Sequence, residues 1–221
     1  MMEQHLPFLR SLPLLREMTD EEILRLLGCL RARERRFEKN QIVWEPAARL
    51  PFLCVIVEGG LRISQEDWRG NRSIVGDFGP GDFLGEVAAA DGALPFFLSV
   101  PAATTVILLE SNAAMNPCAR RCGAHLYLLR NMVDALARKE ERLLDKIEYL
   151  SRRTTREKLM AYLAIQAARE GSRRVRVPYT RQELADLLSV DRSAMCTELT
   201  RMQNDGLLRC DRRHFELLDK K

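Results

Sequence analysis

Residues 180–208 read TRQELADLLSVDRSAMCTELTRMQNDGLL, and this stretch decides the fold of the C-terminal third of the chain. It begins with Thr180 and Glu183 at the spacing of a capping box, in which two side chains bind each other's backbone N–H groups at the start of a helix. Three leucines follow at helical spacing, and the pattern then breaks. A second helix is predicted from near Asp191 to Gly206, because glycine commonly ends a helix.

The second predicted helix has one apolar side and is followed by a hairpin pattern. Its apolar side chains at helical spacing are Met195, Leu199 and Met202. Residues 207–210, a charged turn and residues 214–218 then predict a small hairpin. Helix, short turn, helix and hairpin is the order of a winged helix-turn-helix, and an ordinary helical hairpin is the alternative.

The polar side of the second predicted helix has residue types that bind a DNA major groove. Arg192 lies in its first turn, where a guanidinium can form two hydrogen bonds with a guanine edge. Arg181 and the capped start of the preceding helix suit a phosphate group. The candidate DNA-binding residues on the two helices are Thr180, Arg181, Gln182, Arg192, Ser193, Cys196, Thr197, Thr200 and Arg201.

Basic residues concentrate in the same part of the chain. Residues 151–221 contain 16 Lys and Arg against 10 Asp and Glu and so carry a net charge of +6, whereas the whole chain carries +4. The first 150 residues are therefore slightly acidic, at −2. This distribution favours a polyanion as the partner of the C-terminal part, although a solvated charged surface gives the same count.

The N-terminal half has a different, strand-rich pattern. A short helix is predicted over residues 19–30, with Thr19 as its N-cap and Glu22 three residues further on. From Glu34 to Glu110, short runs of β-forming residues alternate with glycine-containing turns, which predicts an antiparallel sandwich or roll. These runs cover residues 41–44, 52–57, 61–64, 73–78 and 104–109.

A long helix with a heptad pattern is predicted between these two parts. Asn116 is a suitable N-cap, and Pro117 suits the first helical position. Spacings of three and four residues alternate along one stripe, and Glu140 is its one polar interruption. The other members of the stripe are Cys122, Leu126, Leu129, Val133, Leu136, Leu143, Ile147 and Leu150. So narrow a stripe predicts a homodimer through paired helices, and packing on the chain's own domain is the alternative.

The composition of the 221-residue chain excludes several classes of protein. Hydrophobic residues at 46% and charged residues at 30% fit a soluble globular protein. The sequence contains no run of 18 or more uncharged apolar residues, so no membrane span is predicted. It shows no signal peptide pattern either, and a cytoplasmic location is therefore expected. The three histidines and six cysteines form no dense cluster, which argues against a metal enzyme, a cupin-like active site and a histidine-based dyad. We expect no enzyme.

Two blocks of the sequence resemble one known family. Residues 180–195, with their continuation to 206–208, resemble the helix-turn-helix of the Crp/Fnr family of bacterial transcription regulators, and GDFLGE at residues 81–86 resembles that family's cyclic-nucleotide-binding signature. The resemblance covers nearly the whole chain. It implies an α+β fold with an N-terminal antiparallel β-roll (a double-stranded β-helix of cyclic-nucleotide-binding type), a dimerisation helix and a C-terminal winged helix-turn-helix. The three parts are predicted at residues 1–115, 116–150 and 151–221.

The resemblance carries over unevenly to the effector site. Glu86, after Gly85, matches the family's glutamate that binds the ribose hydroxyls of cyclic AMP. Phe96 and Phe97 replace the family's phosphate-binding arginine and the serine beside it, and phenyl rings cannot replace the water around a phosphodiester anion. We therefore expect no cyclic AMP; the two phenylalanines either fill the roll or line a pocket for a more apolar effector. The effector-pocket candidates are Gly85, Glu86, Phe96, Phe97 and Glu140.

The resemblance also implies partners for the DNA-binding part. Arg192 matches a family arginine that reads guanine, whereas Ser193 and Thr197 replace a glutamate and an arginine that read further bases in the cyclic AMP receptor. DNA binding to a two-fold operator is therefore expected, but with a different operator sequence. RNA polymerase is a further partner that the family implies. The alternative function is a cyclic-nucleotide-type binding module that acts on a protein partner.

Cysteines and histidine offer a second possible signal. Fnr-type members hold an iron–sulfur cluster through clustered N-terminal cysteines, but only Cys29 lies near this N-terminus, so no such cluster is expected. Cys118, Cys122 and His125 stand on one face of the predicted helix, where they could hold haem or a metal, or form a redox-sensitive thiol site. Alternatively, Cys122 is a small residue of the stripe and His125 faces solvent. The regulator is thus predicted to respond to an unknown effector or redox signal.

Overall fold

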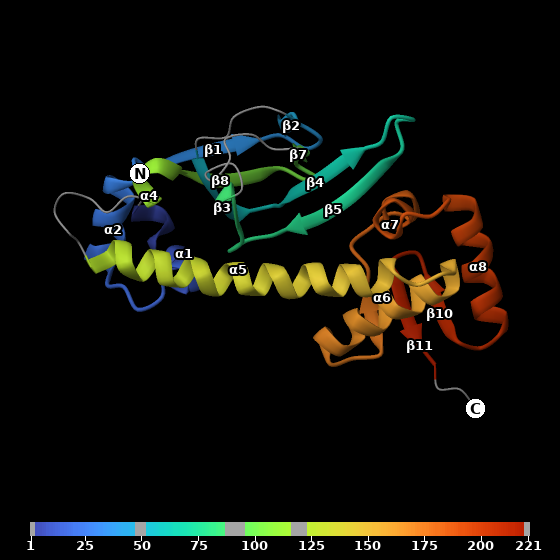
Figure 1. Cartoon of the computed structure of the whole chain (residues 1–221). Coiled ribbons are helices and arrows are strands. Elements are labelled where there is room, and N and C mark those ends of the chain that lie inside the picture. The colour runs from blue at the N-terminus through green and yellow to red at the C-terminus, as the bar shows by residue number, and fades with distance from the viewer. Residues whose placement is uncertain (1–2, 47–51, 87–95, 116–122, 219–221) are drawn as a thin grey trace. The chain divides into compact units, whose positions relative to one another are not determined.

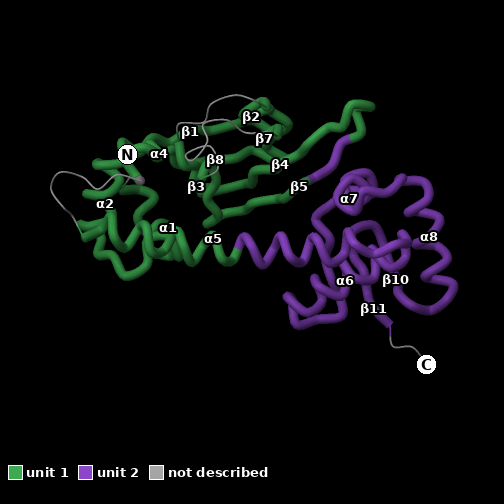
Figure 2. The backbone as a smooth tube through the Cα atoms, viewed as in Figure 1, with its two compact units in different colours: residues 1–71, 75–138 green, residues 72–74, 139–221 purple. Residues whose placement is uncertain are grey.

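The computed structural model describes residues 3–46, 52–86, 96–115 and 123–218 (Figure 1). These residues form two compact units (Figure 2). The first unit contains residues 1–71 and 75–138, and the second contains residues 72–74 and 139–221. The units divide α5 (Gly123–Leu150) between residues 138 and 139, and the first three residues of strand β5 (Arg72–Phe78) are grouped with the second unit. The division into three functional parts at residues 115 and 150 stays a prediction.

The first unit is built on two four-stranded sheets. Their strand orders are β1-β8-β3-β6 and β2-β7-β4-β5, and the pairs β1–β8, β3–β8, β3–β6, β2–β7 and β4–β7 are antiparallel. The strands are β1 (Arg33–Phe37), β2 (Ile42–Trp44), β3 (Phe52–Glu58), β4 (Leu61–Glu66), β5 (Arg72–Phe78), β6 (Phe83–Leu84), β7 (Phe97–Ser99) and β8 (Thr104–Glu110). The predicted antiparallel roll is confirmed.

Three of these strands were not predicted from the sequence. All five predicted runs are strands, with ends within two residues of the expected ones. β1 was missed because its sequence is RERRF, in which only Phe37 is fully buried. β6 and β7 were missed because strands of two and three residues are too short to show an alternating pattern.

An apolar cluster lies on each face of the β1-β8-β3-β6 sheet. Side chains of both sheets meet in the roll interior, among them Ile56, Leu61 and Leu98. On its other face, β3 and β8 contribute to a second cluster, shared with helices from the N-terminus and with α5. The remaining helices of this unit are η1 (Glu3–His5), α1 (Leu6–Ser11), η2 (Pro13–Leu15), α2 (Asp20–Cys29) and α4 (Ser111–Met115). The predicted capping box forms at the start of α2, where the Glu22 N–H donates to the Thr19 hydroxyl.

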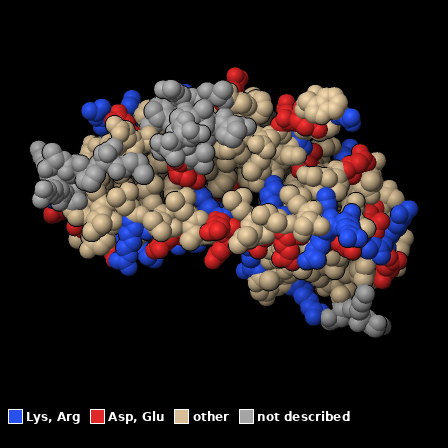
Figure 3. Space-filling view, in the orientation of Figure 1, with Lys and Arg blue, Asp and Glu red and all other residues tan. Residues whose placement is uncertain are grey.

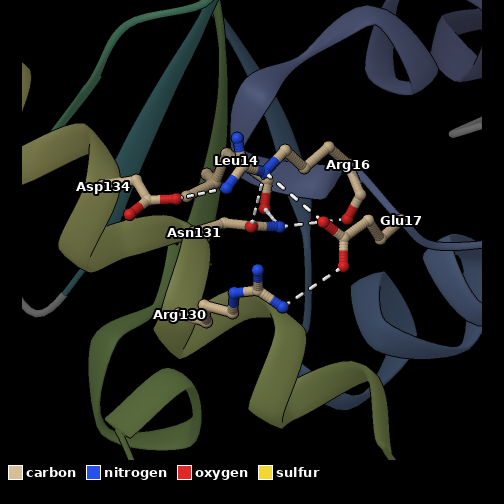
Figure 4. Close-up of polar contacts among 6 residues, drawn as sticks. All are labelled: Leu14, Arg16, Glu17, Arg130, Asn131 and Asp134. Carbon is tan, nitrogen blue, oxygen red and sulfur yellow. Dashed lines mark hydrogen bonds and ion pairs between the residues drawn. The ribbon is translucent and has the colours of Figure 1, made fainter.

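A buried polar residue joins the N-terminal segment to α5 (Figure 4). The side-chain amide of Asn131, which is 1% exposed, donates to the carbonyls of Leu14 and Arg16, both at 3.1 Å. Its oxygen accepts from the Arg16 guanidinium at 3.2 Å, and the same guanidinium contacts Asp134. Because a buried amide with specific partners tolerates few alternative packings, these contacts fix α5 in one position against residues 14–16. The predicted start of the helix at Asn116 lies outside the described residues.

The second unit contains a three-helix core with a three-stranded sheet. Its elements are the last part of α5, α6 (Thr155–Glu170), β9 (Arg174–Arg176), α7 (Arg181–Leu188), α8 (Arg192–Asn204), β10 (Leu208–Asp211) and β11 (His214–Leu217). The sheet order is β10-β11-β9, and both pairings are antiparallel. The capping box of α6 uses Thr154 and Glu157, and the helix ends at Gly171 in the left-handed conformation. The predicted winged helix-turn-helix is confirmed.

Candidate DNA-binding and effector sites

Local contacts set the two ends of α7 and the start of α8. The Glu183 N–H donates to the Thr180 hydroxyl at 3.2 Å, and the Thr180 N–H donates to the Glu183 carboxylate at 2.7 Å. α7 ends at Ser189, whose φ of 51° is in the left-handed region. Asp191 then caps α8, because its carboxylate accepts the Ala194 N–H at 2.8 Å. These contacts define where α7 begins and ends and where α8 begins.

α8 has one buried and one exposed face, as the predicted recognition helix requires. Met195, Leu199 and Met202 lie in the core of the second unit. Among the candidates on this helix, Cys196 is half-buried, and the exposed ones are Arg192, Ser193, Thr197, Thr200 and Arg201. This exposed face combines short hydroxyl side chains with arginine, the composition that a major groove accepts.

Several of these polar side chains already have partners within the helix. The Ser193 hydroxyl donates to the Asp191 carboxylate at 2.6 Å, and this bond, together with the Ala194 N–H, lowers the pKa of Asp191. The Thr200 hydroxyl donates to the Cys196 carbonyl at 3.2 Å. For Arg192, by contrast, no carboxylate of the described part of the chain lies within 4.0 Å of the guanidinium. Arg192 therefore has its donors available for an outside acceptor.

The predicted phosphate-binding residue on α7 packs against the hairpin. The Arg181 guanidinium lies 5.0 Å from the centroid of the Phe215 ring, and one of its nitrogens is 3.5 Å from the Cys210 sulfur. Gln182 donates to Asp186 one turn further along α7. The guanidinium has five N–H donors, so Arg181 can tie α7 to β11 and still reach a phosphate.

Basic side chains outside the predicted set surround this motif. Figure 3 shows Lys and Arg over the second unit, mixed with acidic residues. Arg212 and Arg213 form the tip of the β10–β11 hairpin and are exposed. Sequence reasoning also missed Arg156 at the start of α6, which forms ion pairs with Glu198 and Asp205. No local pattern could have revealed these pairs, because the partners are more than 40 residues apart in the sequence.

In the roll, Gly85 of the glycine–glutamate pair lies directly against the backbone of Phe52. Gly85 has a φ of 109°, and a Cβ there would lie 2.3 Å from the Phe52 carbonyl oxygen, so only glycine fits. Glu86 is half-buried directly after it. The backbone geometry alone therefore accounts for a glycine at position 85.

The two phenylalanines of the effector-pocket candidates lie differently. Phe96 packs against the cluster in the roll interior, to which Leu98 also belongs. Phe97 is half-buried and precedes Leu98 on β7, and successive side chains of a strand point to opposite faces. Phe96 thus lies on the side of the roll interior, whereas Phe97 points to the other face of β7. Filling the roll and lining a pocket both stay predictions. Glu140, the remaining candidate, is exposed on α5 in the second unit.

A buried arginine of the roll does not replace the missing phosphate-binding one. Arg62 donates from Nε and Nη2 to the two carboxylate oxygens of Asp77, at 2.6 and 3.1 Å. It stands on β4 between Leu61 and Ile63, whose side chains belong to the roll cluster, so the Arg62 side chain, itself 6% exposed, extends from the opposite face of the strand. Its charge is paired with the Asp77 carboxylate. The expectation that cyclic AMP does not bind stays a prediction.

The proposed cysteine and histidine site falls largely outside the described residues, which exclude Cys118 and Cys122. His125 is buried at 3% exposure, which corrects the expectation that it faces solvent. The reason is that Ala124 and Leu128, on the same side of α5, pack into the core of the first unit. Within the described ranges, no group of three or more His, Cys, Asp or Glu side chains could hold a metal ion.

The described cysteines differ in exposure. Burial raises the pKa of Cys54 to about 12, so its thiol stays protonated at neutral pH. Cys29, Cys196 and Cys210 are half-buried free thiols. Redox sensing stays a prediction, and its predicted residues on α5 are not among these.

The predicted dimer stripe is largely exposed on α5. Leu129 and Leu150 are half-buried against the cores of the first and second units, respectively. The other described members are between 39% and 73% exposed, and we call these five residues the α5 stripe: Leu126, Val133, Leu136, Leu143 and Ile147. Five large apolar side chains in one row are unusual on a helix that faces water. Among the described residues, no helix is long and apolar enough to cross a membrane.

Comparisons with known proteins match both units of the chain. A family model of the Crp-like helix-turn-helix domain matches residues 157–221, and one of the cyclic nucleotide-binding domain matches residues 34–114. The transcriptional activator protein FnrL of Cereibacter sphaeroides is 24% identical over 202 residues, which cover 84% of this chain and 76% of FnrL. The nitrogen fixation regulation protein FixK of Bradyrhizobium diazoefficiens is 28% identical over 169 residues, which cover 74% of this chain and 69% of FixK.

A solved structure shows the same fold. The c-di-GMP-responsive global regulator CLP of Xanthomonas campestris superposes with a TM-score of 0.75 at 18% identity, covering 91% of this chain and 100% of the CLP chain. In this chain the roll, apart from the first residue of β1, lies within the range matched by the cyclic nucleotide-binding model, the winged helix-turn-helix lies within the range matched by the Crp-like model, and α5 lies between the two ranges. The chain belongs to the Crp/Fnr family of DNA-binding transcription regulators.

Proposed function

We propose that this regulator acts as a homodimer in which two α5 helices pair through the α5 stripe and two α8 helices bind the half-sites of a two-fold operator. The observation that carries the proposal is the exposure of the α5 stripe in the single chain. A parallel pair of helices with apolar residues at spacings of three and four buries such a row. A two-fold axis between the helices then relates the two recognition helices, which must meet major grooves about 34 Å apart.

A signal at the roll is the second part of the proposal. The first half of α5 is held by Asn131 and by the apolar cluster on the helix-covered face of the sheet. β3 and β8 contribute side chains both to this cluster and to the roll interior, so a ligand in the roll that shifts these strands would move the helix that carries the stripe. The apolar interior, with Phe96 against it, favours an effector less charged than a cyclic nucleotide. A redox signal at Cys118 or Cys122 is the alternative. Contact with RNA polymerase is proposed from the family alone.

A salt-dependent gel shift on duplex DNA tests this function against a module that acts on a protein partner. The probe is a duplex enriched by the wild-type protein from a random-sequence library, and the control is an unrelated duplex of the same length. We expect a shift that weakens steeply with salt and favours the enriched duplex. Absence of any shift on either duplex would favour the protein-partner alternative.

The effector is best sought on the purified protein itself. An absorption spectrum detects haem or a chromophoric metal site, and mass spectrometry of the released small molecules detects a tightly held ligand. Titration with cyclic AMP in a calorimeter should show weak binding or none, because Phe96 offers no charge to the phosphate. A micromolar dissociation constant that Glu86→Ala abolishes would show this part of the proposal to be wrong.

A further inference from the structure

One arginine at the start of α6 joins two points of the recognition helix. The Arg156 Nε donates to the Glu198 carboxylate at 2.5 Å, and Arg156 Nη1 lies 2.8 Å from an Asp205 carboxylate oxygen. The Glu198 side chain is only 16% exposed. Glu198 lies in the middle of α8 and Asp205 is its C-cap. The guanidinium therefore spans two turns of the helix that is predicted to enter the groove.

The apolar contacts of α8 are made mostly by methionine, a residue that specifies the orientation of a helix less sharply than branched or aromatic side chains do. Two of its three buried side chains, Met195 and Met202, are methionines, whose flexible chains adapt to small rotations and shifts of a helix. A planar guanidinium with fixed donor directions is much less tolerant of such shifts. Two acceptors seven residues apart then fix both the rotation of α8 about its axis and its position along that axis.

The same contacts balance a negative charge on a helix that is to approach a polyanion. Glu198 is the one acidic residue within α8, and its second carboxylate oxygen lies 3.6 Å from Arg201. The hydrogen bonds to Glu198 and Asp205 raise the pKa of Arg156, as expected for mutual stabilisation of opposite charges. Without Arg156, Glu198 would keep only the longer contact with Arg201.

We infer that Arg156 is a positioning residue for DNA recognition, which sets the orientation of α8 through Glu198 and Asp205 without touching a base. The inference rests on the proposed function, since it concerns the same DNA-binding surface. It distinguishes Arg156 from Arg192, whose exposed guanidinium has no carboxylate partner among the described residues.

The test compares two duplexes and three arginine variants. Arg156→Met keeps the aliphatic stem but removes the charge, and it should weaken binding to the enriched duplex about tenfold, comparable to the loss of one base contact. Binding to the unrelated duplex should fall much less, because phosphate contacts tolerate a tilted helix. Arg156→Lys, a point charge that can bind one carboxylate, should lie in between. The matched control is Arg169→Met, which removes the same charge from the last turn of α6, where the partner is Asp145.

A second variant tests the route through Glu198 and guards against misfolding. Glu198→Gln alone should also lower the preference for the enriched duplex, and Arg156→Met should add little to it, because both changes break one interaction. Circular dichroism melts report whether each variant folds, and Arg156→Lys together with Glu198→Gln still tests the inference if Arg156→Met does not fold.

Three outcomes would overturn the inference. Equal losses on both duplexes, in Arg156→Met as in Arg169→Met, would mean that Arg156 contributes charge alone. Unchanged preference in every folded variant would mean that α8 keeps its orientation without Arg156. Failure of the wild type to bind any duplex would overturn the proposed function, and this inference with it.

Discussion

The outer faces of α5 and α8 are both exposed, yet they differ in chemistry. α8 presents Arg192 and short hydroxyl side chains, whereas α5 presents the apolar α5 stripe. The other face of each helix is buried in a core of the same chain. Each helix thus has one face buried in the apolar cores of the chain and one face that the described residues leave exposed.

The difference indicates two kinds of partner. A polar, arginine-bearing face is stable in water and gains from a polyanion. An apolar row is costly in water and gains from another apolar surface. The heptad spacing makes a second copy of α5 the matching surface, because each stripe can pack into the gaps of the other. The two faces therefore predict a dimer of chains on one duplex.

The largest expected effect comes from a charge placed in the α5 stripe. Leu136→Asp removes an apolar contact in both chains and buries two like charges. At about 1.5–3 kcal/mol for each leucine, the dimer should lose roughly 3–6 kcal/mol, more than a hundredfold in the dissociation constant. Sedimentation equilibrium measures it. Arg138→Asp, on the same helix but off the stripe, is the control and should leave the dimer intact.

If Leu136→Asp associates as tightly as the wild type, or if the wild type is monomeric at micromolar concentration, the α5 stripe does not hold two chains together.

The next effect concerns the polar face of α8. Arg192→Ala should cost about 1–3 kcal/mol on the enriched duplex and relax the preference at one base pair, because a bidentate base contact is lost. Arg181→Ala, the matched control on α7, should instead weaken binding to all sequences and lower the salt slope. Gel shifts over a salt series measure both. Equal loss on enriched and unrelated DNA for Arg192→Ala would contradict the groove assignment.

A smaller effect is expected where the α5 stripe is interrupted. Glu140 would face its symmetry mate, and two carboxylates across an axis repel unless they are protonated, hydrated or paired with a base. Glu140→Leu should therefore tighten the dimer about tenfold and make DNA binding less dependent on conditions. Glu141→Leu adds the same side chain beside the stripe and serves as control. If the dimer is equally tight in both variants and in the wild type, Glu140 does not face its symmetry mate within the stripe.

The smallest effect is a pH dependence at the start of α8. The Ser193 hydroxyl and the Ala194 N–H lower the pKa of Asp191 below that of the unfolded chain, about 3.9. A lowered pKa stabilises the fold above the unfolded value, and this contribution is lost as the pH falls through the folded value. Wild type should thus be more stable than Asp191→Asn near neutral pH, and thermal melts should show the difference begin to shrink as the pH falls below about 4. A difference that does not change with pH would contradict this cap.

The sequence predicts the second unit nearly completely because its determinants are local. The capping box at Thr180, the break after Leu188 and the spacing of Met195, Leu199 and Met202 all act within a few residues. The long-range contacts could not be predicted in this way. Arg156 with Glu198 depends on the tertiary packing of two helices, and no spacing in the sequence relates them.

The first unit was predicted less completely for a related reason. Charged β1 is a strand because it pairs with β8, and that pairing joins residues some 70 positions apart. His125 is buried because α5 packs on the roll, which a helical pattern alone does not reveal. Asn131 gave no sequence signal as a core residue, although it makes the most specific contact of α5 with the N-terminal segment.

The composition of the protein–DNA complex tests the pairing of the two faces most directly. The measurement is the mass of the complex on the enriched duplex, by native mass spectrometry or sedimentation, together with the sequence of that duplex. The account predicts two chains per duplex and an inverted repeat whose half-sites lie about one helical turn apart. One chain per duplex, or an enriched sequence without two-fold symmetry, would contradict it.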